Sequence, residues 1–288
     1  MKKHIWEEKR EAIEMDILEL MDRMDRRYIF LGLIILCFAP LVFPFKLPVP
    51  IEKASRMSYQ AFESLPPRSV ICIQMDYSGS SAAELYPQNL VAVKHAYKKD
   101  FRVILMAQNA MAPQLANRIF IESGYAATKR YGVDYVNLGY NAGGEAAMAV
   151  FARDTWSAFP YDYYRTPVEN IPLMKDVRSL KDIGLMIFTT ASSQDVYIRQ
   201  YTGQGTPVIG HIQSLYYSVM ETYLSAGQIV GYLNGLKGTA EYELLVDRPG
   251  AGLVSMDQAS ATHFYAIALI IVGNIGYFAK KRLRKKEA

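Results

Sequence analysis

Two long apolar runs constrain this chain more than any other feature. The first, Tyr28 to Phe45, has 18 residues and no charge; the second, Phe264 to Ala279, has 16, or 19 when counted from Ala261. About 20 apolar residues cross the hydrocarbon core of a bilayer as a helix. Aromatic and basic residues flank both runs, as they flank membrane helices. The sequence therefore predicts transmembrane helices at 28–45 and 261–279, the alternative being two buried core helices.

The basic residues at the two ends predict how the chain crosses the membrane. Seven precede the first run and six follow the second: Lys2, Lys3, Lys9, Arg10, Arg23, Arg26 and Arg27, then Lys280, Lys281, Arg282, Arg284, Lys285 and Lys286. Lys and Arg collect on the cytoplasmic side of membrane helices. Both ends, including the tail 280–288, are therefore expected in the cytoplasm, and the segment between the runs in the periplasm or outside the cell.

The segment between the runs has no net charge. Residues 46–260 hold 19 basic and 19 acidic side chains, once the seven and six basic residues and the eight and one acidic residues of the two ends are set aside. The overall charge of +4 is therefore a membrane-topology signal, and it predicts a lipid bilayer rather than nucleic acid as partner. The two cysteines, Cys37 and Cys72, have no metal-binding spacing and predict no disulfide.

The leader, residues 1–27, has an apolar stripe on a charged background. Trp6, Ile13 and Leu20 recur every seven residues, and Ile17 and Met24 occupy the intermediate position. Two to three heptads of this kind predict an amphipathic helix that associates with a second copy or with another subunit of a membrane complex. The alternative is a helix that lies on the membrane surface.

Prolines set a linker at 46–68, and from residue 69 strand-like and helix-like segments alternate. Strands are predicted at 69–75, 101–108, 133–140, 183–190 and 206–212, with helices at 81–100, 112–132, 144–156 and 193–201 and a long helix after 212. Short continuous apolar strands separated by helices indicate a parallel sheet covered on both faces. Residues 69–260 are therefore expected to form a doubly wound α/β domain of Rossmann or flavodoxin type with a mostly parallel sheet.

This architecture predicts where a ligand would bind, because open α/β sheets bind ligands beyond the carboxyl ends of their strands. Small and polar residues follow the predicted strands and are the candidate ligand-binding set: Asp76, Ser78, Ser80, Asn109, Asn141, Gly143, Gly144, Glu145, Ser192, Asp195 and His211. The alternative is ordinary turn chemistry, since loops between strands and helices are polar in any case.

Asp76, Ser78 and Ser80 have a spacing that resembles the metal-ion-dependent adhesion motif of von Willebrand factor A domains, Asp-x-Ser-x-Ser after a first strand. A carboxylate and two hydroxyls are oxygen ligands of the kind that Mg²⁺ takes. The resemblance also implies a later threonine and a second aspartate, whereas the third predicted strand ends in "NLGYNAGG" with no acid before Glu145. Mg²⁺ is the only metal or cofactor that the sequence offers a place for.

Three glycines, Gly227, Gly231 and Gly235, recur every four residues in a stretch that carries Glu221 as its one charge between 214 and 236. On a helix they would form one smooth face against which another helix packs closely. Such a face predicts tight packing within the domain or a contact between subunits. A separate tract, 156–177, is rich in tyrosine and proline and predicts either a contact surface or an irregular cap over the domain's own core.

The segments "GVDYVNLGYNAGGEAAM" and "GLKGTAEYE", followed shortly by a membrane helix, resemble prokaryotic membrane proteins that carry a domain of unknown function. The resemblance covers most of residues 69–279. It implies this layout and no activity.

Three classes of function follow from these features. The first expectation is a membrane-anchored scaffold or complex subunit that self-associates. The alternative is a binding module that holds a small ligand or a metal at the strand ends. An enzyme is the third, with Glu145, Asp76 and His211 as its acid–base candidates.

Overall fold

The computed structural model describes residues 25–45 and 47–287. The chain divides into two compact units, residues 48–253 and the two ends, 1–47 with 254–288. The heptad residues of the leader, Trp6, Ile13, Ile17, Leu20 and Met24, lie outside the described residues, so their helix remains a prediction.

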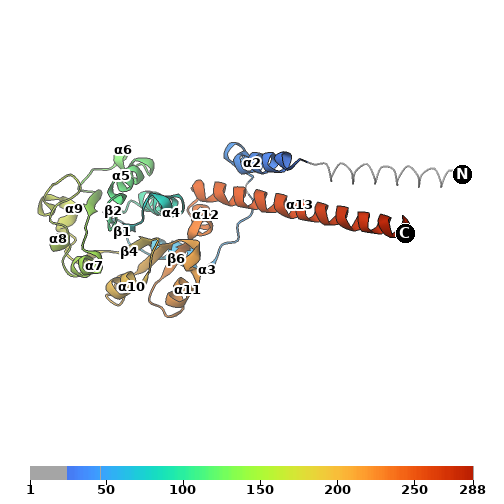
Figure 1. The fold of residues 1–288 in the computed structure, drawn as a ribbon. Helices are drawn as coiled ribbons and strands as arrows, with labels where there is room; N and C mark the ends of the chain where they lie inside the picture. The colour runs from blue at the N-terminus through green and yellow to red at the C-terminus, as the bar shows by residue number, and fades with distance from the viewer. Residues whose placement is uncertain (1–24, 46, 288) are drawn as a thin grey trace. The chain divides into compact units, whose positions relative to one another are not determined.

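The central unit is built on one parallel sheet of six strands in the order β3-β2-β1-β4-β5-β6 (Figure 1). The strands are β1 (Val70–Asp76), β2 (Arg102–Ala107), β3 (Tyr135–Tyr140), β4 (Leu185–Thr190), β5 (Val208–Ile212) and β6 (Gly231–Asn234). Every neighbouring pair is parallel. This confirms the α/β class and fits a Rossmann-like fold, and the five predicted strands are all present.

Helices cover both faces of the sheet. Those of the central unit are α3 (Lys53–Glu63), α4 (Gly79–Lys98), α5 (Ala112–Glu122), α6 (Tyr125–Thr128), α7 (Gly144–Arg153), α8 (Thr155–Ala158), α9 (Pro172–Lys175), α10 (Asp195–Tyr201), α11 (Tyr217–Ser225) and α12 (Gly235–Val246), with 3-10 turns at Val168–Asn170, Leu180–Asp182 and Ser214–Tyr216. One core layer lies between the sheet and α4, α5 and α12, and the other between the sheet and α7, α10 and α11.

The strands read as continuous apolar runs because side chains on both faces are buried. In β1, Ile71 and Ile73 pack into the layer beneath α4, whereas Val70 and Cys72 pack into the opposite layer. The sequence lacks the alternation of polar and apolar residues that an exposed sheet face requires. A sheet covered on both sides follows from this pattern.

The long helix predicted after residue 212 is wrong, and with it the glycine face. Gly227 lies in a turn with φ +69°, Gly231 is the first residue of β6, and Gly235 opens α12 with φ +56°. A positive φ is incompatible with a right-handed helix, so the three glycines cannot share a helical face. Their spacing of four is coincidental, and the interface prediction for them loses its basis.

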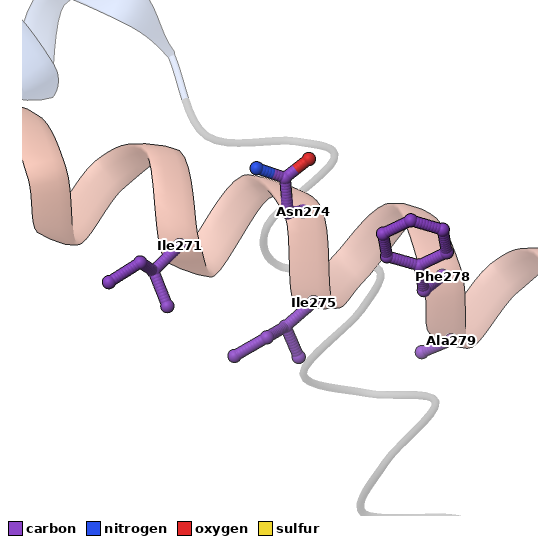
Figure 2. Close-up of a pocket in the computed structure, with 5 residues that line it drawn as sticks. All are labelled: Ile271, Asn274, Ile275, Phe278 and Ala279. Atoms are coloured by element: carbon purple, nitrogen blue, oxygen red, sulfur yellow. The ribbon is translucent and has the colours of Figure 1, made fainter.

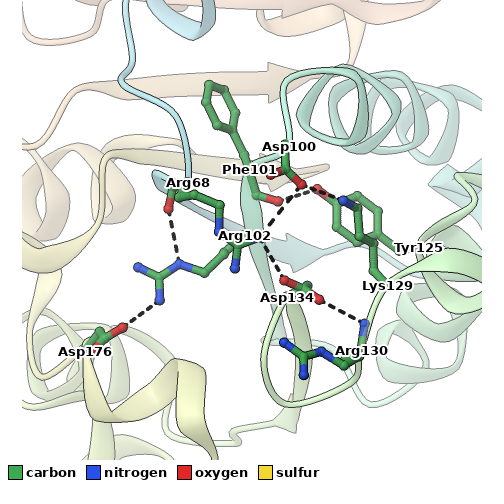
Figure 3. Close-up of polar contacts among 9 residues, drawn as sticks. All are labelled: Arg68, Asp100, Phe101, Arg102, Tyr125, Lys129, Arg130, Asp134 and Asp176. Carbon is green, nitrogen blue, oxygen red and sulfur yellow. Dashed lines mark hydrogen bonds and ion pairs between the residues drawn. The ribbon is translucent and has the colours of Figure 1, made fainter.

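Ion pairs connect the elements at the edge of the sheet where the strands begin (Figure 3). Arg68 lies 2.8 Å from Asp134, and Arg102, at the start of β2, lies 2.6 Å from Asp176. Burial alone would raise the pKa of Asp134, but the Arg130 amide and the Arg68 guanidinium lower it. These charged groups all have partners within the domain, so their role is to stabilise the fold. A ligand site is therefore sought at the other edge, where the strands end.

The terminal unit contains two helices, α2 (Arg26–Val42) and most of α13 (Ala251–Glu287). Among residues 25–45 and 47–287, one helix is long and apolar enough to cross a membrane, the segment Ala251–Ala279 of α13. The first apolar run forms α2, which has 17 residues and contains Pro40. At 1.5 Å per residue it rises about 26 Å, short of the roughly 30 Å of a bilayer core. Two membrane helices were predicted, and one is found.

The two helices of this unit run antiparallel. The Tyr265 hydroxyl donates to the Ile29 carbonyl at 3.1 Å, and the Gln258 amide donates to the Cys37 carbonyl at 2.8 Å. The second bond lies within one turn of Pro40, which lies inside α2 and has no amide hydrogen to give to the Leu36 carbonyl. In this register the apolar run of α2 lies beside α13 residues that precede Tyr265. The two apolar runs therefore overlap at one end only.

Candidate functional site

The sheet order places the ends of β1 and β4 next to each other. The chain runs from β1 outward to β2 and β3, then returns across β1 to begin the other half of the sheet at β4. The loops after β1 and β4 therefore leave in opposite directions, and the switch point between them, called the crevice below, is where folds of this kind bind ligands. Asp76 pairs with Thr190 in the register of these two strands.

Asp76 is the one carboxylate at this crevice. Its Oδ2 accepts a hydrogen bond from the Tyr197 hydroxyl at 2.5 Å, and the Thr190 hydroxyl contacts the same phenol oxygen. Tyr197 is fully buried and stacks on Phe188 with ring centroids 4.8 Å apart. Burial raises the pKa of Tyr197, so the phenol keeps its proton and remains a donor. The partly buried carboxylate is thereby fixed in orientation, with Oδ1 left for another group.

Residues with hydroxyl groups stand in both of the loops that follow β1 and β4. The hydroxyls of Ser78 and Ser80 lie 2.8 Å apart at the start of α4, and those of Thr190 and Ser192 lie 3.0 Å apart after β4. The Ser78 side chain makes no capping bond to the helix that follows. The sequence-predicted residues Asp76, Ser78, Ser80 and Ser192 thus lie at the ends of two neighbouring strands or in the loops that follow them.

A buried polar network supports the crevice from below. The Asn89 Oδ1 accepts from the Thr189 hydroxyl at 2.6 Å and lies 2.8 Å from His211 Nδ1. The Asn89 amide nitrogen in turn donates to the Tyr77 hydroxyl at 3.2 Å. Because this oxygen can only accept, His211 must carry its proton on Nδ1. Burial lowers the pKa of His211 to about 3, so the ring is neutral and sealed from solvent.

Several predicted residues serve their own loops. The Asn109 carboxamide accepts from the Met111 amide at 3.0 Å. Asn141 accepts from the Gly143 amide at 3.0 Å and donates to the Ala158 carbonyl at 2.7 Å, while Gly144 adopts φ +53° as α7 begins. Asn141 follows β3, two strands from β1 and so roughly 10 Å across the sheet. These loops show ordinary turn chemistry.

The two other predicted acids are already paired. Both carboxylate oxygens of Glu145 accept from the Arg199 guanidinium, at 3.0 and 2.9 Å, and Gln200 adds a third bond. These bonds lower the pKa of Glu145. Asp195 accepts from the Tyr223 hydroxyl. Glu145, Asp76 and His211 therefore lie in three separate sets of partners and form no acid–base constellation.

The predicted Mg²⁺ site has one carboxylate, that of Asp76. The strand next to Asp76 contributes the hydroxyls of Thr190 and Ser192 where a second carboxylate would complete a shell. Across the part of the chain that the structure describes, no group of three or more His, Cys, Asp or Glu side chains could hold a metal ion.

Three contributors were absent from the sequence-based set. Tyr197 orients Asp76, and Asn89 organises the layer beneath it, although both come from helices with no distinguishing pattern. A third, Glu84, accepts from the Ser214 amide at 2.9 Å and from its hydroxyl at 2.7 Å, tying α4 to the loop after β5. Only the contact between elements distant in sequence identifies them.

No family of known proteins, no curated protein and no solved structure matches this chain.

Proposed function

We propose that this chain is a membrane-anchored binding protein whose α/β domain holds a small hydroxylated ligand between β1 and β4. The observation that carries the proposal is the adjacency of these two strands, since Asp76 and four residues with hydroxyl groups stand at their ends or in the loops that follow. A carboxylate held by Tyr197 accepts hydrogen bonds from ligand hydroxyls without having to reorient. Such preorganisation favours binding because less conformational entropy is lost.

The anchor in this proposal is α13, with its basic carboxyl-terminal end on the cytoplasmic side, as the positive-inside rule favours. The α/β domain then lies outside the cytoplasm.

Ligand screening with a matched pair of variants tests the crevice. The full chain in detergent micelles is screened by thermal shift against a panel of polyols, pentoses, hexoses and MgCl₂, and we expect at least one polyol or sugar to raise the melting temperature. Asp76→Asn retains an acceptor for Tyr197 but loses the charge, so the affinity should fall by about tenfold or more. Glu145→Gln, a control outside the crevice, should bind as the original chain does.

Two results would count against this function. One is a panel in which no polyol or sugar changes the melting temperature, and the other is a shift that Asp76→Asn leaves intact. A rise in melting temperature with MgCl₂ alone that disappears in Asp76→Asn would favour a Mg²⁺ site at Asp76 instead.

A second candidate, self-association as a scaffold, is favoured by Asn274 in α13. Figure 2 shows its amide projecting from one side of α13 and the Ile271 and Ile275 side chains projecting from the other. The amide nitrogen donates to the Ile270 carbonyl of its own helix at 2.9 Å, and the exposed Oδ1 has no partner among the described residues. In hydrocarbon such an oxygen gains from a donor on another helix. We propose that Asn274 of a second copy supplies it.

Replacement of Asn274 measures that contact. Asn274→Leu should weaken a dimer by about tenfold, since interhelical hydrogen bonds contribute about 1–2 kcal/mol in peptides. Light scattering of the micelle-embedded chain over a range of dilutions gives the dissociation constant. Asn274→Gln retains the amide and should associate more strongly than the leucine variant. A chain that is monomeric at every dilution, or a leucine variant that associates unchanged, would rule out this contact.

A further inference from the structure

A hollow lined by tyrosines lies beside the edge strand β3, away from the Asp76 crevice. Its volume is about 420 Å³, within the roughly 300–1,000 Å³ of small-molecule sites. The end of β3 and the start of α5 form one wall, and the loop 158–165 forms the other. This loop belongs to the tyrosine- and proline-rich tract for which the sequence predicted a contact surface or a core cap.

The loop is held rigidly, so the hollow is preformed. The buried carboxylate of Asp162 accepts from the Tyr131 hydroxyl at 2.7 Å and from the Thr166 amide at 2.8 Å. Tyr163 packs edge-to-face on Tyr164, with centroids 5.2 Å apart, and Tyr164 packs in the same way on Tyr131. Rings fixed by such contacts bind a ligand without first losing side-chain freedom.

Arg165 is the unusual residue of this hollow. Its backbone has φ +67°, a left-handed conformation that is strained for arginine and natural for glycine. The turn from Asp162 to Arg165 closes by a backbone bond of 3.0 Å, and Arg165 occupies the left-handed position that follows it. Within the described residues the guanidinium has no hydrogen bond or ion pair. The chain thus has an arginine where the backbone favours glycine, and its charge is free beside the hollow.

The other polar groups at the rim are free too. The Gln114 amide and the hydroxyls of Tyr140, Tyr161 and Tyr163 make no hydrogen bond to another described residue. The three rings are between 37% and 52% exposed, so their faces are accessible. A guanidinium pairs with a carboxylate through two parallel hydrogen bonds, and the negative face of an aromatic ring attracts polarised C–H groups. A sugar ring that bears a carboxylate presents both kinds of group.

A second hollow adjoins the first and points to a ligand longer than one ring. It measures about 290 Å³ and shares Pro160 and Tyr161 with the first, continuing past them to Trp156 and Glu169. The Arg178 guanidinium lies over the Trp156 ring, 3.9 Å from the centroid. Two hollows that share Pro160 and Tyr161 leave room for a ligand of more than one sugar ring, with the acidic ring beside Arg165.

An extended peptide fits this place less well. Peptides that bind at the edge of a sheet do so through the backbone groups of the edge strand. In β3 the Asn137 carbonyl already accepts from the Tyr163 amide at 2.9 Å, so the loop itself covers the edge. We propose that the hollow binds an acidic oligosaccharide, with Arg165 holding the carboxylate and Tyr161 and Tyr163 contacting the rings. This proposal does not depend on a ligand at Asp76.

Calorimetric titration of the full chain in micelles tests the proposal. The probes are disaccharides of galacturonate, glucuronate and N-acetylneuraminate, with cellobiose as the neutral comparison. At least one acidic disaccharide should bind with a dissociation constant of about 1 mM or lower, and more tightly than cellobiose. Arg165→Gly should weaken it about tenfold or more, since charge-assisted bonds are lost. Tyr163→Ala should also weaken it.

The controls separate binding from folding and from the other site. Glycine relieves the strain at position 165, so Arg165→Gly should melt no lower than the original chain. Asp76→Asn should bind the acidic disaccharide unchanged, whatever it does to ligands of the crevice. The proposal is overturned if no acidic disaccharide binds, or if Arg165→Gly binds equally well. It is also overturned if a proline-rich peptide binds and the saccharides do not.

Discussion

Lowering the pH from 7 to 4.5 is expected to reduce the free energy of unfolding by about 2–3 kcal/mol through His211 alone. The ring is 1% exposed, and its Nδ1 is committed to Asn89 at 2.8 Å. Protonation of the other nitrogen would place a charge in the core with no acidic partner in contact. The neutral form is therefore strongly favoured in the folded protein.

The direction of the effect follows from the two pKa values of His211. Burial lowers the folded value to about 3, whereas the unfolded value is about 6.5. Between these values the unfolded chain binds more protons, so the stabilisation is complete above about pH 6.5 and is lost as the pH falls toward 3. Burial also lowers the pKa of His95. The pKa of Glu63 is lowered by its hydrogen bond to His95. Both therefore add to the loss in acid.

Denaturant unfolding followed by Trp156 fluorescence, in a Trp6→Phe background, measures this effect between pH 8 and 4.5. His211→Asn places an amide nitrogen near the position of Nδ1 and carries no titrating group, so its stability should depend less steeply on pH. An equally steep dependence in His211→Asn would show that the acid sensitivity arises elsewhere.

Gly231→Ala is expected to destabilise the α/β domain by about 3 kcal/mol. A Cβ at this position would lie 2.3 Å from the Ser58 hydroxyl oxygen, 2.6 Å from the Ser58 amide nitrogen and 2.9 Å from its Cα. Two of these atoms are backbone, so α3 as a whole would have to move away from β6. The packing of α3 against β6 would then be lost in part.

Gly79→Ala is the matched control, because a Cβ there meets only the Met111 Cε at 3.6 Å. It should unfold at nearly the same denaturant concentration as the original chain. Light scattering on Gly231→Ala separates two roles of the glycine. Lower stability with unchanged association agrees with packing inside the domain. Unchanged stability with lost association would restore the subunit contact that the sequence predicted.

The predictable part of the fold is the part with a long local signal. β1 and β4 each begin with four consecutive apolar residues, and the helices between strands are amphipathic, so their types could be assigned from spacing alone. β6 has four residues, "GYLN", between two glycine-containing turns, and no local pattern separates it from a helix. Its strand conformation comes from pairing with β5 and from the approach of α3 to Gly231.

The sequence could predict which residues follow the strands, but not which of those residues lie near one another. Asp76, Ser78 and Ser80 are close in sequence, and Ser192 joins them because β4 lies next to β1. Asn141 and Glu145 also follow a predicted strand, but that strand is β3, at the edge of the sheet and away from β1 and β4. The Glu145 carboxylate is in addition paired with Arg199. Strand order depends on pairing across long sequence separations, which the residues at the ends of strands do not encode.

The sequence by itself determined the alternation of strands and helices, the covered parallel sheet and an apolar segment long enough to cross a membrane. Each of these depends on the periodicity and length of apolar runs, which are local properties. Tertiary structure alone decided that Gly231 faces Ser58, that His211 is sealed beneath the crevice and that Tyr197 orients Asp76. Each of these is a contact between residues more than 100 positions apart, and it exists only once the sheet has brought their elements together.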